Sequence, residues 1–314
     1  MSVDKVMKVR NGLTELVDKL SAVFSTDEVI SEVMYMRKYV VSPYAEQIEK
    51  TLREVGIFKL DYYSEIQMIA PELTLEDAKL YGLIDRNGNY LLGGRYVVPI
   101  RDIMGNVTAL VGWYPDDKKY VTTPTYGFSK DGQFFNIECY AKSFEGDYPK
   151  YKDEETGEVL ESTGMVYLVE GIFDTLSLRS LGFPVLGNMG LDMSLMKTEI
   201  LSRFGKVIAI PDNDKAGMGS NPYLSRISGK GKKAEWQIKN ENVIVQLPKG
   251  VKDSDDFVKG YYCFEDLLRC QKAKYKIKLS EDWFNFMHDF LFFILLNFHD
   301  YFKEEARYGK KSRC

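Results

Sequence analysis

The first sixty residues place apolar side chains at helical spacing. Thr26 has the residue type and setting of an N-cap, and Ser42-Pro43 predicts the start of a further helix that ends near Val55. We therefore expect residues 1–60 to form a helical N-terminal region. Intervals of three and four residues put one apolar set on a single helix face: Leu13, Leu16, Val17, Leu20, Val23 and Phe24.

A different pattern begins after residue 60. Thr74 predicts the N-cap of a short helix, and Arg86-Asn87-Gly88-Asn89 has the composition of a hairpin turn. From residue 90 to about residue 135, short apolar runs alternate with turn residues, which favours strands. The charged stretch 145–163 predicts an exposed loop or hairpin insertion. We expect residues 61–160 to form a mixed α+β subdomain with basic character.

Strand and helix patterns alternate over residues 161–260. Two apolar runs bounded by polar residues predict buried strands, and the segments between them predict a helix, a short strand with a glycine loop, and another helix. This order predicts an α/β fold, with a mostly parallel, Rossmann-like sheet flanked by helices. The strands are expected at 165–169, 184–187 and 207–210, and the helices at 174–181 and 194–204.

Acidic residues follow both buried strands. Glu170 ends the first strand, and Asp212-Asn213-Asp214 follows the other. The carboxyl ends of parallel strands meet at one sheet edge, where open α/β sheets bind their ligands. A polar turn would explain the tripeptide alone, but Glu170 at the same edge favours a cation site, because a divalent cation relieves the repulsion between carboxylates. We predict a Mg²⁺ or Mn²⁺ site formed by Glu170, Asp212 and Asp214.

This arrangement resembles the Toprim domain, which is shared by bacterial-type primases, type IA and type II topoisomerases and several nucleases. Glu170 matches the glutamate that ends a strand in that domain, and Asp212 and Asp214 match its Asp-x-Asp element. The resemblance implies metal-dependent phosphoryl transfer on nucleic acid.

Segments on both sides of this unit resemble the RNA-polymerase core of DnaG-type primases. Residues 94–102, Gly-Arg-Tyr-Val-Val-Pro-Ile-Arg-Asp, match a stretch of that core. Residues 118–132 are similar to its Pro-Lys-Tyr-Leu-Asn-Ser-Pro and Phe-His-Lys-Gly elements, with Lys118 replacing the first proline and Ser129 the histidine. The acidic segment 253–258 follows in the family's order. The resemblance covers about residues 75–260 and implies a DNA-dependent RNA primase.

The resemblance also implies roles for further residues. Asp174, Asp253 and Asp255 would bind more metal or orient the first ligands, although each could instead favour the start of a helix. Lys215 follows the acidic pair and could reach a phosphate, and Tyr120 could stack on a base. Basic residues at family positions linked to template or nucleotide binding are Arg95, Arg101, Lys119 and Lys130.

Composition changes this interpretation in two ways. The chain has 314 residues and a formal charge of −4, so any nucleic-acid surface must be a local basic patch. Four cysteines and two histidines show no metal spacing, so no structural zinc is expected. DnaG-type primases usually carry an N-terminal zinc ribbon. We therefore expect a core without that ribbon, served by a separate zinc-binding subunit or by a different means of site selection.

The implied reaction joins ribonucleoside triphosphates on single-stranded DNA, with a replicative helicase as a further candidate partner. A Toprim nuclease would use the same acids to activate water, but it needs no basic segment from Arg95 to Lys130. A non-catalytic single-strand-binding subunit would not need intact Glu170, Asp212 and Asp214. The sequence favours a topoisomerase least, because no separate domain with a nucleophilic tyrosine is evident.

Residues 261–314 form the last predicted part, a helical C-terminal segment. Its stretch 280–308 is apolar nearly all round, which favours a core helix over a helix that docks a replication partner. The run 290–298 is far shorter than the roughly 20 residues needed to span a bilayer, and residues 1–10 lack a signal core. No membrane contact is expected. Scattered thiols suit a reducing cytoplasm, that of a bacterial host if the protein is phage-encoded.

Overall fold

A computed structural model describes most of the chain to residue 212 and parts of the segment that follows. Two predicted site residues, Asp214 and Lys215, lie outside the described residues, as do the side chain of Lys119 and the segment 261–314. The described ranges are 2–42, 44–115, 117–144, 150–152, 159–161, 165–190, 193–212, 241–244, 247 and 251–259.

The helices expected in the first sixty residues are present, but the last three residues of the predicted 1–60 region form a strand, β1 (Phe58–Leu60), of an antiparallel sheet. The helical part lies between residues 3 and 55. It contains α1 (Val3–Phe24), α2 (Asp27–Met36), the short 3₁₀ helix η1 (Tyr39–Val41) and α3 (Ala45–Val55). The N-cap prediction for α2 is confirmed, because the side chain of Thr26 accepts a hydrogen bond from the backbone N–H of Val29.

The start predicted for α3 is displaced. The helix begins at Ala45 with Tyr44 as its N-cap, two residues after Ser42. The hydroxyl of Ser42 accepts a hydrogen bond from the Tyr44 N–H and donates one to the carbonyl of Val258. Ser42 therefore serves a tertiary contact instead of capping the helix, and only the folded chain brings that partner close.

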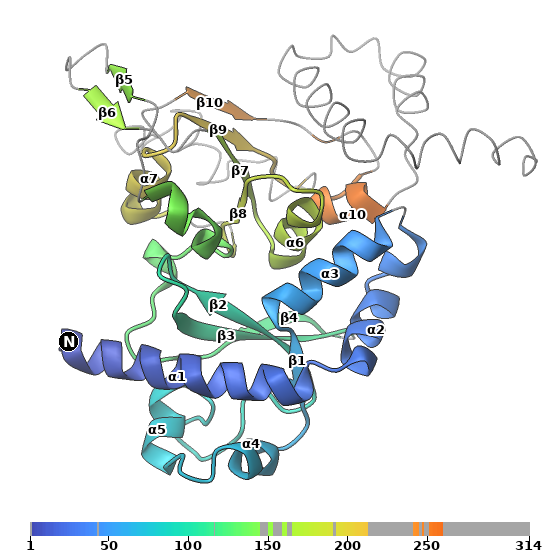
Figure 1. The fold of residues 1–314 in the computed structure, drawn as a ribbon, viewed down its shortest axis with the longest axis vertical. Coiled ribbons are helices and arrows are strands. Elements are labelled where there is room, and N and C mark those ends of the chain that lie inside the picture. The colour runs from blue at the N-terminus through green and yellow to red at the C-terminus, as the bar shows by residue number, and fades with distance from the viewer. Residues whose placement is uncertain are drawn as a thin grey trace, which may run out of the picture.

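An antiparallel sheet forms the second part of the fold (Figure 1). Its strands are β1 (Phe58–Leu60), β2 (Arg95–Arg101), β3 (Val107–Tyr114) and β4 (Asp117–Thr122), in that spatial order. Pro99 lies within β2, beyond the part that pairs with β1, so its missing N–H costs no hydrogen bond to that strand. Helices α4 (Tyr63–Ile69) and α5 (Leu75–Leu80) lie between β1 and β2 in the chain, and Thr74 caps α5 as predicted.

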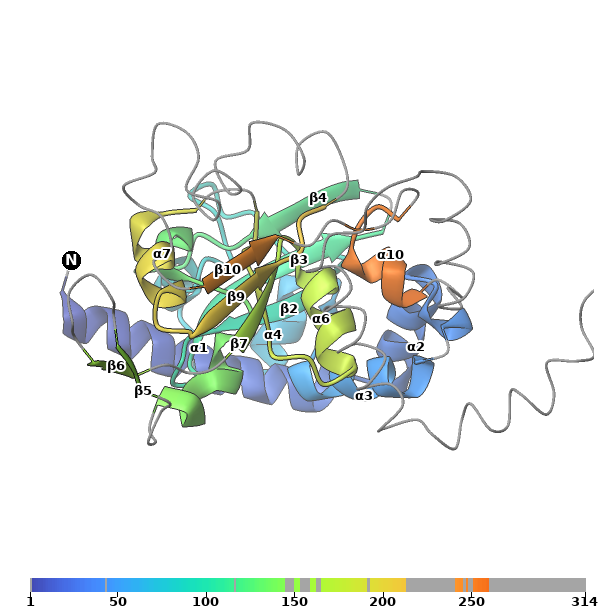
Figure 2. The same ribbon diagram turned by 90° about the horizontal axis from the view of Figure 1, so that it is seen from above.

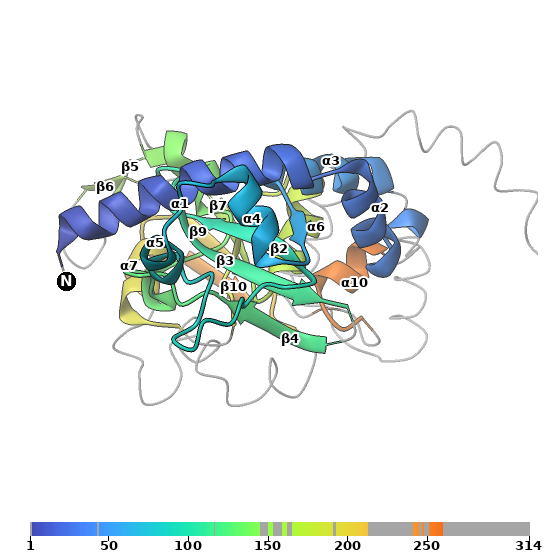
Figure 3. The same cartoon turned by 90° about the horizontal axis from the view of Figure 1, so that it is seen from below.

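Alternating side chains of this sheet enter two different cores. Val97 and Leu110 pack with α1, α4 and α5, which cover one face of the sheet (Figure 3). Tyr96, Val98 and Trp113 point the opposite way and pack with α2, α3 and α6 (Ile172–Ser180). This alternation follows from the period of two in an extended strand, and both faces are buried because helices cover each of them.

A parallel sheet forms the third part, and the predicted α/β fold class is confirmed there. Its strands are β7 (Met165–Val169), β8 (Val185–Gly187), β9 (Lys206–Ala209) and β10 (Glu241–Ile244), in the order β10-β9-β7-β8. One face packs against α7 (Leu195–Leu201) and the 3₁₀ segment η3 (Ile137–Phe144), and the other packs against α6 and α10 (Ser254–Lys259). The remaining elements are the short 3₁₀ helix η2 (Lys130–Gly132) and two strands, β5 (Lys150–Lys152) and β6 (Val159–Glu161). The two strands pair antiparallel within the predicted insertion 145–163.

The two sheets meet through α6. This helix packs against α3 and α10, and all three lie side by side in two views at right angles (Figures 1 and 2). The ring of Trp113 on β3 meets that of Phe173 on α6 edge to face at 4.9 Å, so one core joins both sheets. None of the described helices combines the length and the apolar character that crossing a membrane requires.

Candidate active site

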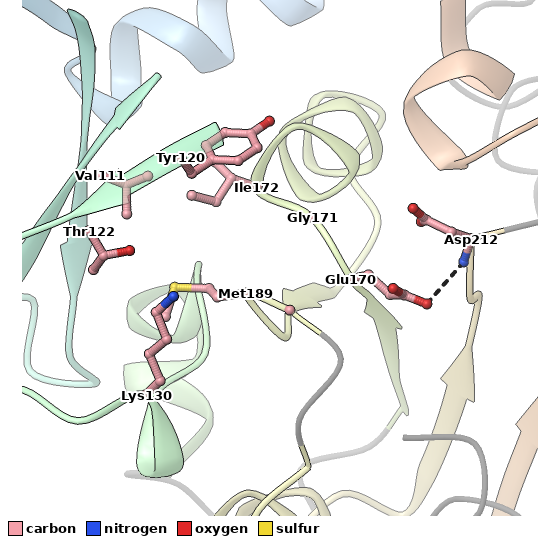
Figure 4. A pocket seen from close by; sticks show the side chains of 10 residues that line it. Val111, Tyr120, Thr122, Lys130, Glu170, Gly171, Ile172, Met189 and Asp212 are labelled. Atoms are coloured by element: carbon pink, nitrogen blue, oxygen red, sulfur yellow. Dashed lines mark hydrogen bonds between the residues drawn. The ribbon is translucent and has the colours of Figure 1, made fainter. Parts of the chain in front are cut away.

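Glu170 and Asp212 lie side by side at one edge of the parallel sheet. Glu170 follows β7 directly, and Asp212 comes after β9, the strand that pairs with β7. The backbone N–H of Asp212 donates to Oε1 of Glu170 at 3.2 Å (Figure 4). The structure therefore brings together two of the three predicted metal ligands, and the third, Asp214, is outside the described residues.

Asp174 adds a buried carboxylate to this edge. It lies in the first turn of α6, and its Oδ1 accepts a hydrogen bond from the backbone N–H of Asp255 at 3.0 Å. A Cβ atom on Gly171 would lie 2.2 Å from Oδ2 of Asp174, so only glycine leaves room for the carboxylate. Burial raises the pKa of Asp174 well above its usual range, and the negative charges of Asp253 and Asp212 add to the shift.

Asp253 starts the last described helix. Its Oδ1 accepts from the backbone N–H of Asp256 at 2.8 Å, and its Oδ2 accepts from Nζ of Lys252 at 2.7 Å. The residue thus satisfies the start of α10, as the capping interpretation of the sequence predicted. Its charge also reaches Asp174, so a capping role and a place in the acidic group are compatible.

Asp255 is the third of the residues predicted to bind further metal or orient its ligands, and its environment differs from those of Asp174 and Asp253. Oδ1 accepts from the hydroxyls of Tyr39 and Ser177, each at 2.6 Å, and Oδ2 accepts from Arg37 and Lys259. Burial alone would raise the pKa of this carboxyl, but the positive charges of Arg37 and Lys259 outweigh it and lower the pKa. Asp255 is therefore a buried carboxylate surrounded by donors.

We call the edge of the parallel sheet that carries Glu170, Asp174 and Asp212 the acidic edge. A cavity of about 490 Å³ connects this edge with the antiparallel sheet. Glu170 and Asp212 form one side, and residues of β3 and β4, including Tyr120, face them across the space (Figure 4). Tyr120 is 46% exposed, and its partial burial raises the pKa of its phenol to about 12. The lining residues are Val111, Tyr120, Thr122, Lys130, Glu170, Gly171, Ile172, Met189, Gly190 and Asp212.

The predicted basic residues divide into two groups. Lys130 is exposed and lines the cavity, as expected for a residue that contacts substrate. Arg101 instead donates to the carbonyl of Gly105 and pairs with Asp18 on α1 at 3.1 Å. Arg95 packs along Gly112 of β3, and neither arginine is among the cavity-lining residues.

The sequence did not reveal several residues near the site. Arg37, Tyr39 and Lys259 surround Asp255, but no local motif distinguishes them from ordinary helix and loop residues. Met189 has φ 57°, the left-handed region that side chains rarely adopt, and it precedes the cavity-lining Gly190. The glycine loop at this position was visible in the sequence as the end of a predicted strand.

The donor set at the acidic edge fits a hard divalent cation. Glu170, Asp212 and Asp174 offer only carboxylate oxygens, the ligands that Mg²⁺ and Mn²⁺ prefer. Burial is the main cause of the raised pKa of Asp174, and a cation beside this carboxylate would offset that cost as well as the repulsion from Asp253 and Asp212. Within the described ranges, no group of three His, Cys, Asp or Glu side chains is arranged to hold a metal ion, and the third predicted ligand, Asp214, lies outside those ranges.

The parallel-sheet part of the chain resembles a known class of domain. Residues 167–258, from β7 to α10, match a family model described as Toprim-like. This range contains Glu170, Asp174, Asp212 and Asp253. The chain therefore carries a Toprim-like domain, as its strand-terminal acids predict.

Primases are among the known proteins that resemble the chain. The DNA primase of Thermotoga maritima is 28% identical over 192 residues, which are 59% of this chain and 30% of that protein. The RNA polymerase domain of Mycobacterium tuberculosis primase DnaG shares the fold with a TM-score of 0.59 at 18% identity, covering 87% of this chain and 84% of the other. The DnaG catalytic domain bound to single-stranded DNA gives 0.58 at 17% identity, with coverage of 85% and 82%.

These matches confirm the resemblance to DnaG-type primases. The chain combines the Toprim-like domain with the fold of their catalytic cores, and its sequence is similar to that of a DNA primase. It spans less than a third of the length of the Thermotoga protein, 30%.

Proposed function

We propose that this protein is a DNA-dependent RNA primase, which joins ribonucleotides into short primers on a single-stranded DNA template. The observation that carries the proposal is the cavity between the two sheets, where Glu170 and Asp212 face Tyr120 and Lys130. A polymerase needs cation ligands beside a surface that binds nucleotide or template, and this cavity has both kinds of group. The similarity to primases supports the same reaction.

Glu170, Asp212 and Asp214 would hold the divalent cations. A bound Mg²⁺ or Mn²⁺ supplies charge neutralisation at the triphosphate and lowers the pKa of the attacking hydroxyl. Lys130 would bind a phosphate oxygen, since it is exposed at the cavity wall. Tyr120 would stack on a base, since its ring lines the cavity and is partly exposed.

Single-stranded DNA and ribonucleoside triphosphates are the proposed substrates. A related catalytic domain, that of a DnaG primase, has been solved with bound single-stranded DNA, which supports the template assignment. We include a replicative helicase or a separate zinc-binding subunit as partners, and the cytoplasm as the site of action, that of a bacterial host if the protein comes from a phage. These assignments extend the primase proposal to its cellular setting.

A primer-synthesis assay tests the proposal. The protein is incubated with single-stranded DNA, labelled ribonucleotides and Mg²⁺ or Mn²⁺, and short RNA is the expected product. Removal of groups that merely orient metal ligands costs roughly 10–100-fold, so Glu170→Gln and Asp212→Asn should each reduce synthesis at least about 100-fold. Chelation of the metal should abolish it. Glu76→Gln, an exposed carboxylate on α5, is the matched control and should retain full synthesis.

The same assay separates the alternatives. Degradation of the template without RNA synthesis would identify a Toprim nuclease, in which the acids serve attack by water. Tight binding of single-stranded DNA with neither reaction would identify a non-catalytic subunit. Both outcomes contradict the primase proposal.

A further inference from the structure

Asp255 belongs by sequence to the acidic residues of the site, but its surroundings separate it from them. We propose that Asp255 is not a metal ligand: it is the buried anchor of α10, and Arg37 is the positioning residue that holds it. The catalytic consequence of this proposal rests on the primase function proposed above. The assignment of Asp255 itself rests on the contacts of its two carboxylate oxygens.

Every acceptor position of Asp255 is occupied. An ionised carboxylate has two oxygens with about four lone-pair sites in total. Four donors occupy them: the hydroxyls of Tyr39 and Ser177 on Oδ1, and the cations of Arg37 and Lys259 on Oδ2. The side chain of Asp255 is only 2% exposed. A metal ion could bind this carboxylate only by displacing a donor from a buried site.

The positive charges around Asp255 also oppose a cation there. Arg37 and Lys259 already place two positive charges on one carboxylate oxygen. The guanidinium of Arg37 is held in place by the ring of Phe173, 4.1 Å away. A divalent cation at the same oxygen would meet both charges at close range in a poorly screened interior. Asp174, in contrast, lies near three carboxylates, those of Asp253, Asp212 and Asp255, and Lys252, the cation nearby, is paired with Asp253.

The anchor connects the N-terminal helices with the acidic edge. Arg37 and Tyr39 follow α2, and both donate hydrogen bonds to the side chain of Asp255. The backbone N–H of Asp255 in turn donates to Asp174 at 3.0 Å. Asp253, two residues before, starts the same helix. The position of α10, beside α6 in Figure 2, therefore places Asp253 and brings the backbone N–H of Asp255 to the carboxylate of Asp174. Arg37 would act on catalysis through this placement, without touching substrate.

Mn²⁺ binding to the full-length protein tests the assignment without any enzymatic assay. Binding is followed by electron paramagnetic resonance and thermal unfolding by circular dichroism. Asp255→Asn should keep the number of bound Mn²⁺ ions and change their affinity less than about threefold, whereas Asp212→Asn should weaken binding tenfold or more. Both Asp255→Asn and Arg37→Gln should lower the melting temperature by roughly 6 °C or more, because each breaks a buried ion pair.

Two further variants sharpen this test. The double variant Arg37→Gln with Asp255→Asn should melt no lower than the worse single variant, because both changes remove the same interaction. Arg53→Gln is the surface control: Arg53 pairs with Asp27 and Glu49 in exposed bridges, and its loss should shift melting by no more than about 2 °C. Loss of a Mn²⁺ ion in Asp255→Asn but not in Arg37→Gln would overturn the proposal.

Primer-synthesis kinetics test the positioning role of Arg37. Well below the melting temperature, Arg37→Gln should lower kcat about tenfold or more with little change in KM, because small displacements of reacting groups are costly. Arg37→Lys, which keeps the charge, should recover part of that loss. An unchanged kcat despite a lower melting temperature would reduce Arg37 to a purely structural residue and refute its positioning role. If the wild-type protein makes no RNA, the primase proposal fails, and the Mn²⁺ and melting results still decide the role of Asp255.

Discussion

At the scale of single residues, identical side chains at this site differ because of their neighbours. Asp174 and Asp255 are both buried aspartates joined by one hydrogen bond, yet the pKa of the first is raised and that of the second is lowered. Nearby carboxylates act on Asp174, and two cations act on Asp255. Neighbouring charge thus decides which acid is suited to a cation and which is already satisfied.

A substitution at Tyr120 tests the base-stacking role. Tyr120→Ala should weaken binding of a short single-stranded DNA by about 1–3 kcal/mol, the typical value of stacking a base on an aromatic ring. Tyr120→Phe keeps the ring and should bind nearly as well as the unmodified protein. Fluorescence anisotropy with a labelled oligonucleotide measures both variants. An equal loss in the phenylalanine variant would assign the effect to the hydroxyl instead.

At the scale of elements, the junction between β7 and α6 carries most of the site. Glu170 ends the strand, Gly171 precedes the helix, and Asp174 lies in the first helical turn. Gly171 allows Asp174 to approach the sheet edge, because any Cβ atom there would collide with its carboxylate. A short connection of this kind positions two acids from one local sequence, and the pairing of β7 with β9 adds Asp212 from far along the chain.

Gly171→Ala tests this junction. The added methyl group should displace the Asp174 carboxylate and reduce primer synthesis about tenfold, while overpacking costs roughly 1–3 kcal/mol of stability. Gly88→Ala is the control, since a Cβ atom there has no neighbour within 4 Å and the hairpin turn is remote from the site. Gly88 has a φ of 90°, so alanine should strain the backbone of the turn and lower stability, but primer synthesis should be unaffected. Full activity in Gly171→Ala would show that the position of Asp174 is not critical.

At the scale of the whole molecule, two sheets enclose the site. The net charge of the chain is negative, so positive charges at the site itself must attract nucleic acid. One core joins helices of the N-terminal region to strands of both sheets, so the cavity walls are held by shared packing. The formal charge of −4 repels nucleic acid at long range. Binding must therefore rely on groups such as Lys130 that lie at the cavity itself.

The salt dependence of DNA binding tests that view. Affinity for single-stranded DNA should fall steeply with salt, and Lys130→Gln should reduce the slope of log affinity against log salt by about 0.7, the value for one phosphate contact. Lys50→Gln, a highly exposed residue on α3, is the matched control and should leave the slope unchanged. An unchanged slope in the Lys130 variant would exclude a phosphate contact there.

The sequence alone determined the elements and the main acids of the site. The strand expected at 165–169 matches β7 residue for residue, and Thr26 and Thr74 cap the helices that they were predicted to cap. These features depend on nearby residues, so their periodicity and chemistry are legible in a short window. Glu170 and Asp212 were foreseeable as neighbours because parallel strands end at one edge.

The pairing of the remaining charges depends on contacts that form only in the folded chain. Asp255 is bound by Arg37, 218 positions earlier in the chain, and Ser42 is directed away from its expected helix by the carbonyl of Val258. Arg101, placed by family resemblance with the substrate-binding residues, pairs with Asp18 of α1. A side chain's partner depends on which distant surfaces the fold brings into contact. Local patterns carry no record of that contact, so the acids were visible in the sequence and their separate roles were not.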